Sequence, residues 1–435
     1  MYLLKNLKKA FVALQGLFIM EQNELIPHLF RTEYHNIVAV LCRLFGIEHI
    51  ETAEDIVSDT FLRATELWGL KGLPPNPSAW LYTVAKNKTK DLLKRDQLFA
   101  QKVAVELKQS LPVPEEIEID LSGQNINDSQ LAMMFAVCHP CISAESQIAL
   151  SLNLLCGFGP EEIAEAFLTN KEVIYKRLNR AKEKLRTEKV KIEQPTLPEI
   201  NERLATVLTT LYLLFNEGYY SRSQNNMLRK DLCLEAMRLT LLLTEHERTN
   251  KAPVNALLSL MCFHSSRFEA RTRENGEIIL YQDQDSSRWN TELIDKGKYY
   301  LKRSSEGDPP LSKYHVEAAI AWWHTQKKDS AEKWESILQL YNRLLQIEYS
   351  PIAALNRTYA LAKANGKERA IPEAEKLGMA GNHLYHLLMG DLYSGVNDEK
   401  ALEHFHLSFD TAKSDAERKL VSKNLKRLNR VITGS

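Results

Sequence analysis

Apolar residues recur every three or four positions along most of this chain, which is the spacing of one face of an α-helix. Glycine and proline are sparse, and no segment alternates convincingly between apolar and polar residues as a β-strand would. The pattern therefore predicts an all-α protein. Breaks in the pattern divide the chain into an N-terminal leader or extra helix over 1–23, a linker over 98–127, and helical blocks over 24–97, 128–191 and 195–435.

The segments outside the blocks carry little sign of secretion or of a membrane span. Residues 1–23 contain lysines before a short apolar run, as a signal peptide does, but the run is short and no cleavage site follows. Either Met20 is the true start or the segment is a small amphipathic helix. No other run approaches the ~18 continuous apolar residues of a span, so we expect a soluble protein without a membrane partner.

The composition limits the possible partners. The 435 residues include 56 basic and 56 acidic ones, so nucleic-acid binding would require positive charge that is concentrated locally. The cysteines are scattered rather than dense, which favours the reducing cytoplasm over secretion. They are Cys42, Cys138, Cys141, Cys156, Cys233 and Cys262.

A first basic helix is predicted over 80–95. Lys86, Lys90 and Lys94 recur every four residues and form one stripe. Between 86 and 95 there are five cations and one carboxylate, an excess that suits a phosphate backbone. The alternative is an ordinary solvated face. The candidate DNA-binding residues of this helix are Lys86, Asn87, Lys90, Asp91, Lys94 and Arg95.

A second basic segment, 159–186, predicts a helix-turn-helix. Pro160 suits the first position of a helix, and residues 168–170 suit a turn. Residues 171–189 carry eight cations against three carboxylates. Polar side chains that reach bases, flanked by cations that hold phosphates, are what a recognition helix needs, although a helical hairpin that does not bind DNA is the alternative. The candidate residues are Lys171, Tyr175, Lys176, Arg177, Asn179, Arg180 and Lys182, all on the second helix.

With these two helices, the chain resembles the extracytoplasmic-function (ECF) subfamily of RNA polymerase sigma factors. Residues 53–68 (AEDIVSDTFLRATELW) and 76–95 (NPSAWLYTVAKNKTKDLLKR) resemble its region two, and 128–190 resemble its region four. The resemblance implies that region two binds core polymerase and reads the minus-ten promoter element, while region four reads the minus-thirty-five element. It also implies that Asp55, Asp59 and Phe61 face the polymerase clamp, with core packing as the alternative for Phe61.

The last block resembles the C-terminal domain of one subgroup of these factors, which carries tetratricopeptide-like repeats. Its signals are CHPCIS (138–143), LLFNEGYYSRS (213–223), RKDLCLEAMRL (229–239) and DQDSSRWN (283–290). Gly390, Tyr393, Ala401 and Phe405 follow the small and aromatic order of such a helical hairpin. We expect an interdomain or regulatory contact at Asp283, Asp285, Arg288 and Trp289, with a ligand or peptide site as the alternative.

Other signals are weaker. Cys138 and Cys141 form a CxxC, but without further ligands at a supporting spacing we interpret the segment as a proline-started helix with small buried residues. Asp283 and Asp285 lack the glycine and distal glutamate of a calcium loop. We therefore predict no metal, no cofactor and no catalytic residue.

The sequence thus predicts a cytoplasmic sigma factor, not an enzyme, that binds core RNA polymerase and promoter DNA. Its C-terminal domain would modulate this activity through an intramolecular contact. One alternative is a helix-turn-helix regulator with a helical-repeat sensor that acts without polymerase, which would leave the 24–97 block without a role. Another is a helical-repeat scaffold, or an enzyme, whose basic helices are merely solvated.

Overall fold

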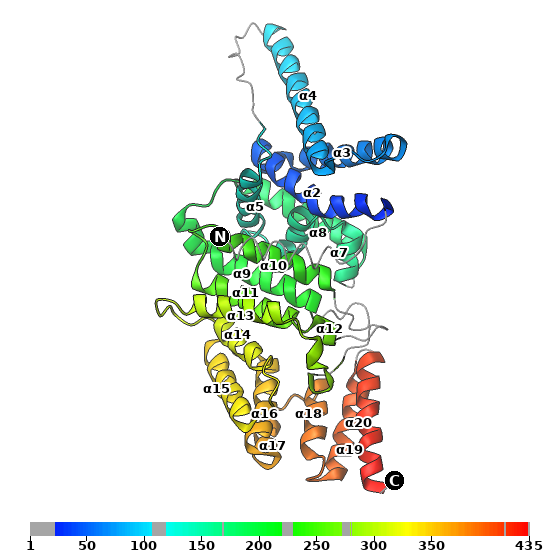
Figure 1. The fold of residues 1–435 in the computed structure, drawn as a ribbon, viewed down its shortest axis with the longest axis vertical. Helices are drawn as coiled ribbons and strands as arrows, with labels where there is room; N and C mark the ends of the chain where they lie inside the picture. Colours follow the sequence, from blue (N-terminus) through cyan, green and yellow to red (C-terminus); the bar gives the residue numbers. More distant parts are fainter. Residues whose placement is uncertain are drawn as a thin grey trace. The chain divides into compact units, whose positions relative to one another are not determined.

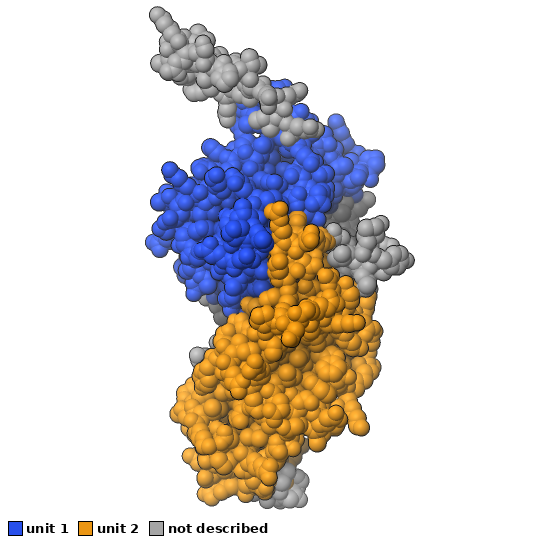
Figure 2. Space-filling model, turned by 90° about the vertical axis from the view of Figure 1, so that its left-hand side faces the viewer, with its two compact units in different colours: residues 1–213 blue, residues 214–435 orange. Residues whose placement is uncertain are grey.

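The computed structural model of this chain describes residues 22–106, 119–167, 169–219, 229–271, 279, 281–412 and 415–433. Within these ranges every regular element is a helix, which confirms the predicted all-α fold (Figure 1). The chain divides into two compact units, unit 1 within residues 1–213 and unit 2 within residues 214–435 (Figure 2). The leader expected over 1–23 lies outside the described residues except for its last two, which begin the first helix.

The first half of unit 1 contains three long helices. They are α2 (Gln22–Phe45), α3 (Ile50–Lys71) and α4 (Pro77–Glu106), with the short helix η1 (Ile47–His49) between α2 and α3. Gly72 ends α3 with a φ of 80°, a conformation that glycine adopts without strain, and Pro77 opens α4. Residues 72–76 (GLPPN), which are rich in glycine and proline, therefore form the turn between these two helices.

The second half of unit 1 contains α5 (Gly123–Val137), α6 (Ala144–Leu150), η2 (Ser151–Leu155), α7 (Pro160–Ala166) and α8 (Lys171–Thr187). Pro160 is the first residue of α7, as its fixed φ favours. The linker expected over 98–127 is helical at both of its described ends. No glycine or proline interrupts α4 before Glu106, and the Ser122 hydroxyl caps α5 by accepting a hydrogen bond from the Asn125 backbone N–H (3.4 Å).

The CxxC segment does not form the proline-started helix that we expected. Pro140 lies in the turn between α5 and α6, and α6 begins later, at Ala144, because Ser143 supplies its cap. Burial raises the pKa of the Cys138 thiol to about 11, and burial also raises the pKa of Cys141. Raised thiol pKa values disfavour the reactive thiolate, in line with a structural role.

Helix α9 (Leu197–Tyr219) spans the division between the units, which falls after residue 213 rather than near 195. The first part of α9 belongs to unit 1 because its side chains bond to α5 and α6. The Arg203 guanidinium donates to the Phe135 carbonyl (3.3 Å), and the Thr210 hydroxyl donates to Gln147 Oε1 (3.1 Å). A proline pair at 195 and 198 marks the start of a helix here and not the end of a compact unit.

Unit 2 is built from helices that pack mainly on their neighbours in the chain, such as α15 with α16 and α18 with α19 (Figure 1). Gly390 shows why the α18 and α19 pair is close. A Cβ at this position would lie 2.6 Å from the ring of Phe405, so only glycine admits the fully buried phenylalanine. The elements of unit 2 after α9 are α10 (Lys230–Glu245), α11 (Ala252–Ser265), α12 (Phe268–Arg271), η3 (Tyr281–Asp283), η4 (Ser286–Arg288), α13 (Thr291–Ser304), α14 (Lys313–Trp323), α15 (Ala331–Ile347), α16 (Pro351–Asn365), α17 (Lys367–Glu375), α18 (His383–Tyr393), α19 (Asp398–Thr411) and α20 (Asp415–Thr433).

Candidate nucleic-acid interface

Helix α3 presents carboxylates to solvent. Asp55 and Asp59 are both exposed, and Asp59 accepts an ion-pair contact from Lys88 of α4 at 3.2 Å. Phe61 is only 4% exposed and packs its ring edge-on against Phe30, with 5.0 Å between ring centroids. The structure therefore places the two aspartates where a partner can reach them, and it places Phe61 in the core.

Helix α4 is held by its apolar face and by a polar network at its start. Leu81 and Ala85 are fully buried. Glu33 of α2 accepts hydrogen bonds from the hydroxyls of Ser78 (2.9 Å) and Tyr82 (2.5 Å), which fixes the rotation of α4 about its axis. Sequence reasoning missed Glu33, because a single glutamate in an amphipathic helix gives no signal. The candidates Asn87, Asp91, Lys94 and Arg95 are exposed, and Lys86 and Lys90 are half-buried.

Helix α8 buries its apolar stripe and exposes most of its candidate DNA-binding residues. Ile174, Leu178, Ala181 and Leu185 are all buried. Arg177 is half-buried, and its guanidinium carbon lies 5.7 Å from the centroid of the Phe167 ring. The exposed candidates are Lys171, Tyr175, Lys176, Asn179 and Arg180.

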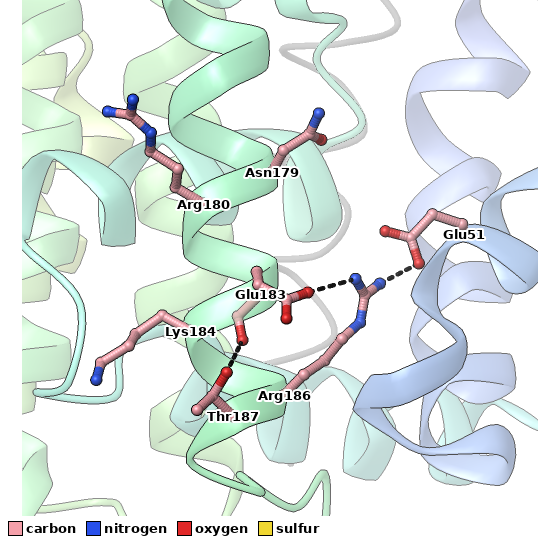
Figure 3. A pocket seen from close by; sticks show the side chains of 7 residues that line it. All are labelled: Glu51, Asn179, Arg180, Glu183, Lys184, Arg186 and Thr187. Atoms are coloured by element: carbon pink, nitrogen blue, oxygen red, sulfur yellow. Dashed lines mark hydrogen bonds and ion pairs between the residues drawn. The ribbon is translucent and has the colours of Figure 1, made fainter.

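The C-terminal half of α8 is bound to α3 instead. Lys182, one of the candidate DNA-binding residues, is instead only 6% exposed and pairs with Glu54 Oε2 at 2.7 Å. Arg186 reaches across to Glu51 of α3 (Figure 3). Burial raises the pKa of Glu51, but the hydrogen bond and charge of Arg186, a backbone hydrogen bond and the charge of Lys182 together outweigh burial and lower that pKa. The Arg186–Glu51 pair borders a pocket of about 680 Å³, whose lining residues are drawn in Figure 3.

Other contacts within unit 1 join the same two halves. The Gln130 side-chain amide of α5 donates to Asn36 Oδ1 of α2 at 2.6 Å, and α2 packs against α5. The Arg43 guanidinium donates to Asn125 Oδ1 at 3.3 Å. The two predicted DNA-binding helices thus belong to one compact unit, which a reading of each block by itself does not reveal.

Three of the expected regulatory residues, Asp283, Asp285 and Trp289, make side-chain contacts within unit 2. Asp285 caps η4, since its carboxylate accepts from the Ser287 N–H (2.9 Å) and hydroxyl (2.7 Å), and these bonds lower its pKa. Asp283 pairs with Lys423 at 3.7 Å. Arg288 is exposed, whereas Trp289 is only 7% exposed.

Among the residues that the structure describes, no cluster of His, Cys, Asp or Glu could hold a metal ion, and no helix is long and apolar enough to cross a membrane.

Comparison with known proteins defines the class first. Residues 29–98, which span most of α2, α3 and the basic part of α4, match the Sigma-70 region 2 family. This match supports a sigma factor family and implies binding to core RNA polymerase and promoter DNA. Residues 203–305 match a family of unknown function (DUF6596).

A relative then gives the particular family. The chain is 32% identical over 359 residues to an uncharacterized protein, R00370, of Rhizobium meliloti (strain 1021), covering 82% of this chain and 84% of the relative. The chain belongs to the same family as this protein. No solved structure matches this chain.

Proposed function

We propose that this chain is a cytoplasmic ECF-type sigma factor that directs core RNA polymerase to particular promoters. The observation that carries the proposal is that the segment matching Sigma-70 region 2 combines an exposed acidic face on α3 with the basic helix α4. In this proposal α3 binds polymerase, α4 reads the minus-ten element and α8 reads the minus-thirty-five element. Unit 2 modulates the activity, and the chain has no catalytic chemistry of its own.

Run-off transcription tests this function. Purified chain with core polymerase should yield discrete transcripts from a set of genomic promoter fragments, and polymerase alone should not. Transcripts that do not depend on the chain would contradict the proposal. DNA binding by the chain without such transcripts would favour the helix-turn-helix regulator instead.

The candidate DNA-binding residues of α8 should divide into two roles. Tyr175, Lys176 and Asn179 would read bases, while Arg177 and Arg180 would hold phosphates. Asn179→Ala should then cost about 1–3 kcal/mol at particular promoter positions, whereas Arg180→Ala should weaken all promoters alike and reduce the salt dependence of binding. Binding to a panel of promoter variants at several salt concentrations measures both. Equal losses on every sequence from both substitutions would refute the division.

The two halves of unit 1 would have to separate for both promoter elements to be read. Elements roughly 25 base pairs apart lie ~85 Å from each other at ~3.4 Å per base pair, whereas here α8 is bound directly to α3. Glu51 and Glu54 precede Asp55 on α3, so polymerase that binds there would meet the same surface as α8.

Weakening the contact between α3 and α8 should therefore release α8. Glu51→Gln with Glu54→Gln leaves Lys182 without its counter-charge, and we expect the affinity for duplex DNA without polymerase to rise by roughly tenfold, about 1.4 kcal/mol. Fluorescence anisotropy with a labelled duplex measures this. The control is Glu48→Gln with Glu66→Gln, two exposed carboxylates of the same region, which changes the net charge equally. Equal affinities of the two variants would contradict the separation.

A further inference from the structure

Buried polar atoms without a hydrogen-bond partner gather around Tyr281 in unit 2. In the described part of the chain there are ten such side-chain atoms, and four of them are Arg267 Nε, Gln284 Oε1, Trp289 Nε1 and His324 Nδ1. All four belong to residues around one tyrosine. Three of the atoms can donate a hydrogen bond, whereas Gln284 Oε1 can only accept one. The ring centroid of Tyr281 lies 4.9 Å from that of His324 and 6.4 Å from that of Trp289. The Arg267 guanidinium carbon lies 5.5 Å from the same centroid. The Gln284 N–H donates to the Tyr281 carbonyl at 3.3 Å. Such a concentration indicates a bound water or ion.

The charge of this cluster decides between a water and an ion. Arg267 is 7% exposed and Lys333 is 1% exposed. Arg267 donates to the Tyr219 hydroxyl (3.3 Å), and Lys333 donates to the Tyr281 hydroxyl (2.8 Å) and to the Gln326 carbonyl (2.9 Å). Among the described residues, neither cation contacts a carboxylate. Buried arginine and lysine almost always have a counter-charge, and a water cannot supply one.

Two acidic side chains of neighbouring segments are engaged elsewhere. Asp329 accepts a hydrogen bond from Trp334 Nε1 (2.5 Å) and pairs with Lys363 at 3.8 Å. Asp283 pairs with Lys423. Burial is the main cause that lowers the pKa of His324 to about 3, and the positive charges of Arg267 and Lys333 lower it further. A negative charge is the missing component.

We propose that Arg267, Tyr281, Trp289, His324 and Lys333 form a binding site in unit 2 for a small anion that carries a carboxylate or a phosphate. Its oxygens accept hydrogen bonds from the unpartnered donors, with Arg267 Nε foremost, and its charge neutralises Arg267 and Lys333. The surrounding aromatic rings exclude water and so strengthen these interactions. The site gives unit 2 a ligand, which the proposed transcription function by itself does not require.

The loop after η3 supplies part of this site. The Asn290 N–H donates to the Ser266 carbonyl at 2.8 Å, which brings Trp289 beside Arg267. The Asp285 cap of η4 fixes the turn that leads into Trp289. The DQDSSRWN motif therefore contributes its tryptophan to the site, while its aspartates act on the loop and on Lys423.

Titration of the full chain with inorganic phosphate and with acetate, against chloride at equal ionic strength, tests the site. Phosphate or acetate should bind in isothermal titration and should raise the thermal midpoint of the wild type. Lys333→Met should lower the affinity at least about tenfold, the effect of losing one hydrogen bond to a charged group. The control is Lys302→Met, an exposed lysine of unit 2. Phosphate stabilises proteins generally, but this effect acts on all variants alike. A preference for phosphate over acetate identifies a phosphate ligand, and the reverse identifies a carboxylate.

The relative stability of the variants gives a second readout. In chloride, Lys333→Met should be at least as stable as the wild type, because it removes a buried charge that has no counter-charge; in the preferred anion the order should reverse. Trp289→Phe keeps an aromatic ring but removes the Nε1–H, so it should weaken anion binding even if Lys333→Met fails to fold. If the wild type and both variants respond to phosphate and acetate as the control does, the site does not exist. This outcome is independent of run-off transcription, so it is distinguishable from a failure of the proposed function.

Discussion

Replacing Asp55 and Asp59 by lysine should abolish co-purification of the chain with core RNA polymerase. Both carboxylates are exposed on α3, within the segment that matches Sigma-70 region 2. In the proposed complex they meet a basic surface of the polymerase clamp, so reversal replaces two attractions by two repulsions, and each like-charge contact costs several kcal/mol. The fold should survive, because the pair of Asp59 with Lys88 is exposed and such pairs contribute about 0–1 kcal/mol.

The matched control for this experiment is Glu332→Lys with Glu368→Lys. Both glutamates are exposed in unit 2, and the double substitution changes the net charge by the same amount. It should leave co-purification unchanged. If the variant of Asp55 and Asp59 still co-purifies with polymerase while its circular dichroism spectrum equals that of the wild type, α3 is not part of the polymerase interface.

A chain that ends at Leu213 should transcribe a cognate promoter about 5- to 150-fold less than the full chain, which corresponds to a coupling of 1–3 kcal/mol between unit 2 and the sigma part. Polymerase binding should be intact, because α3 is retained. The cut is placed after residue 213 because an earlier one, near 191, would remove the part of α9 that bonds to α5 and α6. Run-off transcription over a range of polymerase concentrations measures the loss.

Surface variants of unit 2 refine this prediction. Asp283→Ala with Arg288→Ala alters two exposed residues of the expected regulatory loop and should also change transcription. Trp289→Ala would not serve, because truncating a buried tryptophan costs about 3–5 kcal/mol of stability and would damage unit 2 itself. Asp295→Ala with Lys298→Ala, an exposed pair on α13, is the control. If the shortened chain and the loop variant both transcribe like the full chain, unit 2 does not regulate the sigma part.

The sequence by itself determined the local structure of this protein. The 3.6-residue period of apolar positions fixed the helices, because an apolar stripe at that spacing can be buried only by a helix. Gly72 and Pro77 marked one turn, and Pro160 marked the start of α7, because these residues restrict the backbone wherever they occur. The apolar face of α8 followed from the same period, and so did the exposure of Tyr175, Asn179 and Arg180.

Only the tertiary structure decided which charged side chains meet. Lys182 and Glu54 are 128 positions apart, and Arg186 and Glu51 are 135 apart, so no periodicity within one helix could pair them. The same holds for Arg267, Tyr281 and Lys333, which three separate segments bring together. An apolar stripe is a property of one helix, whereas the partner of a charge depends on how helices distant in sequence pack. The sequence could therefore place each cation on its helix but could not say which of them α3 holds, or which ones are buried without a counter-charge.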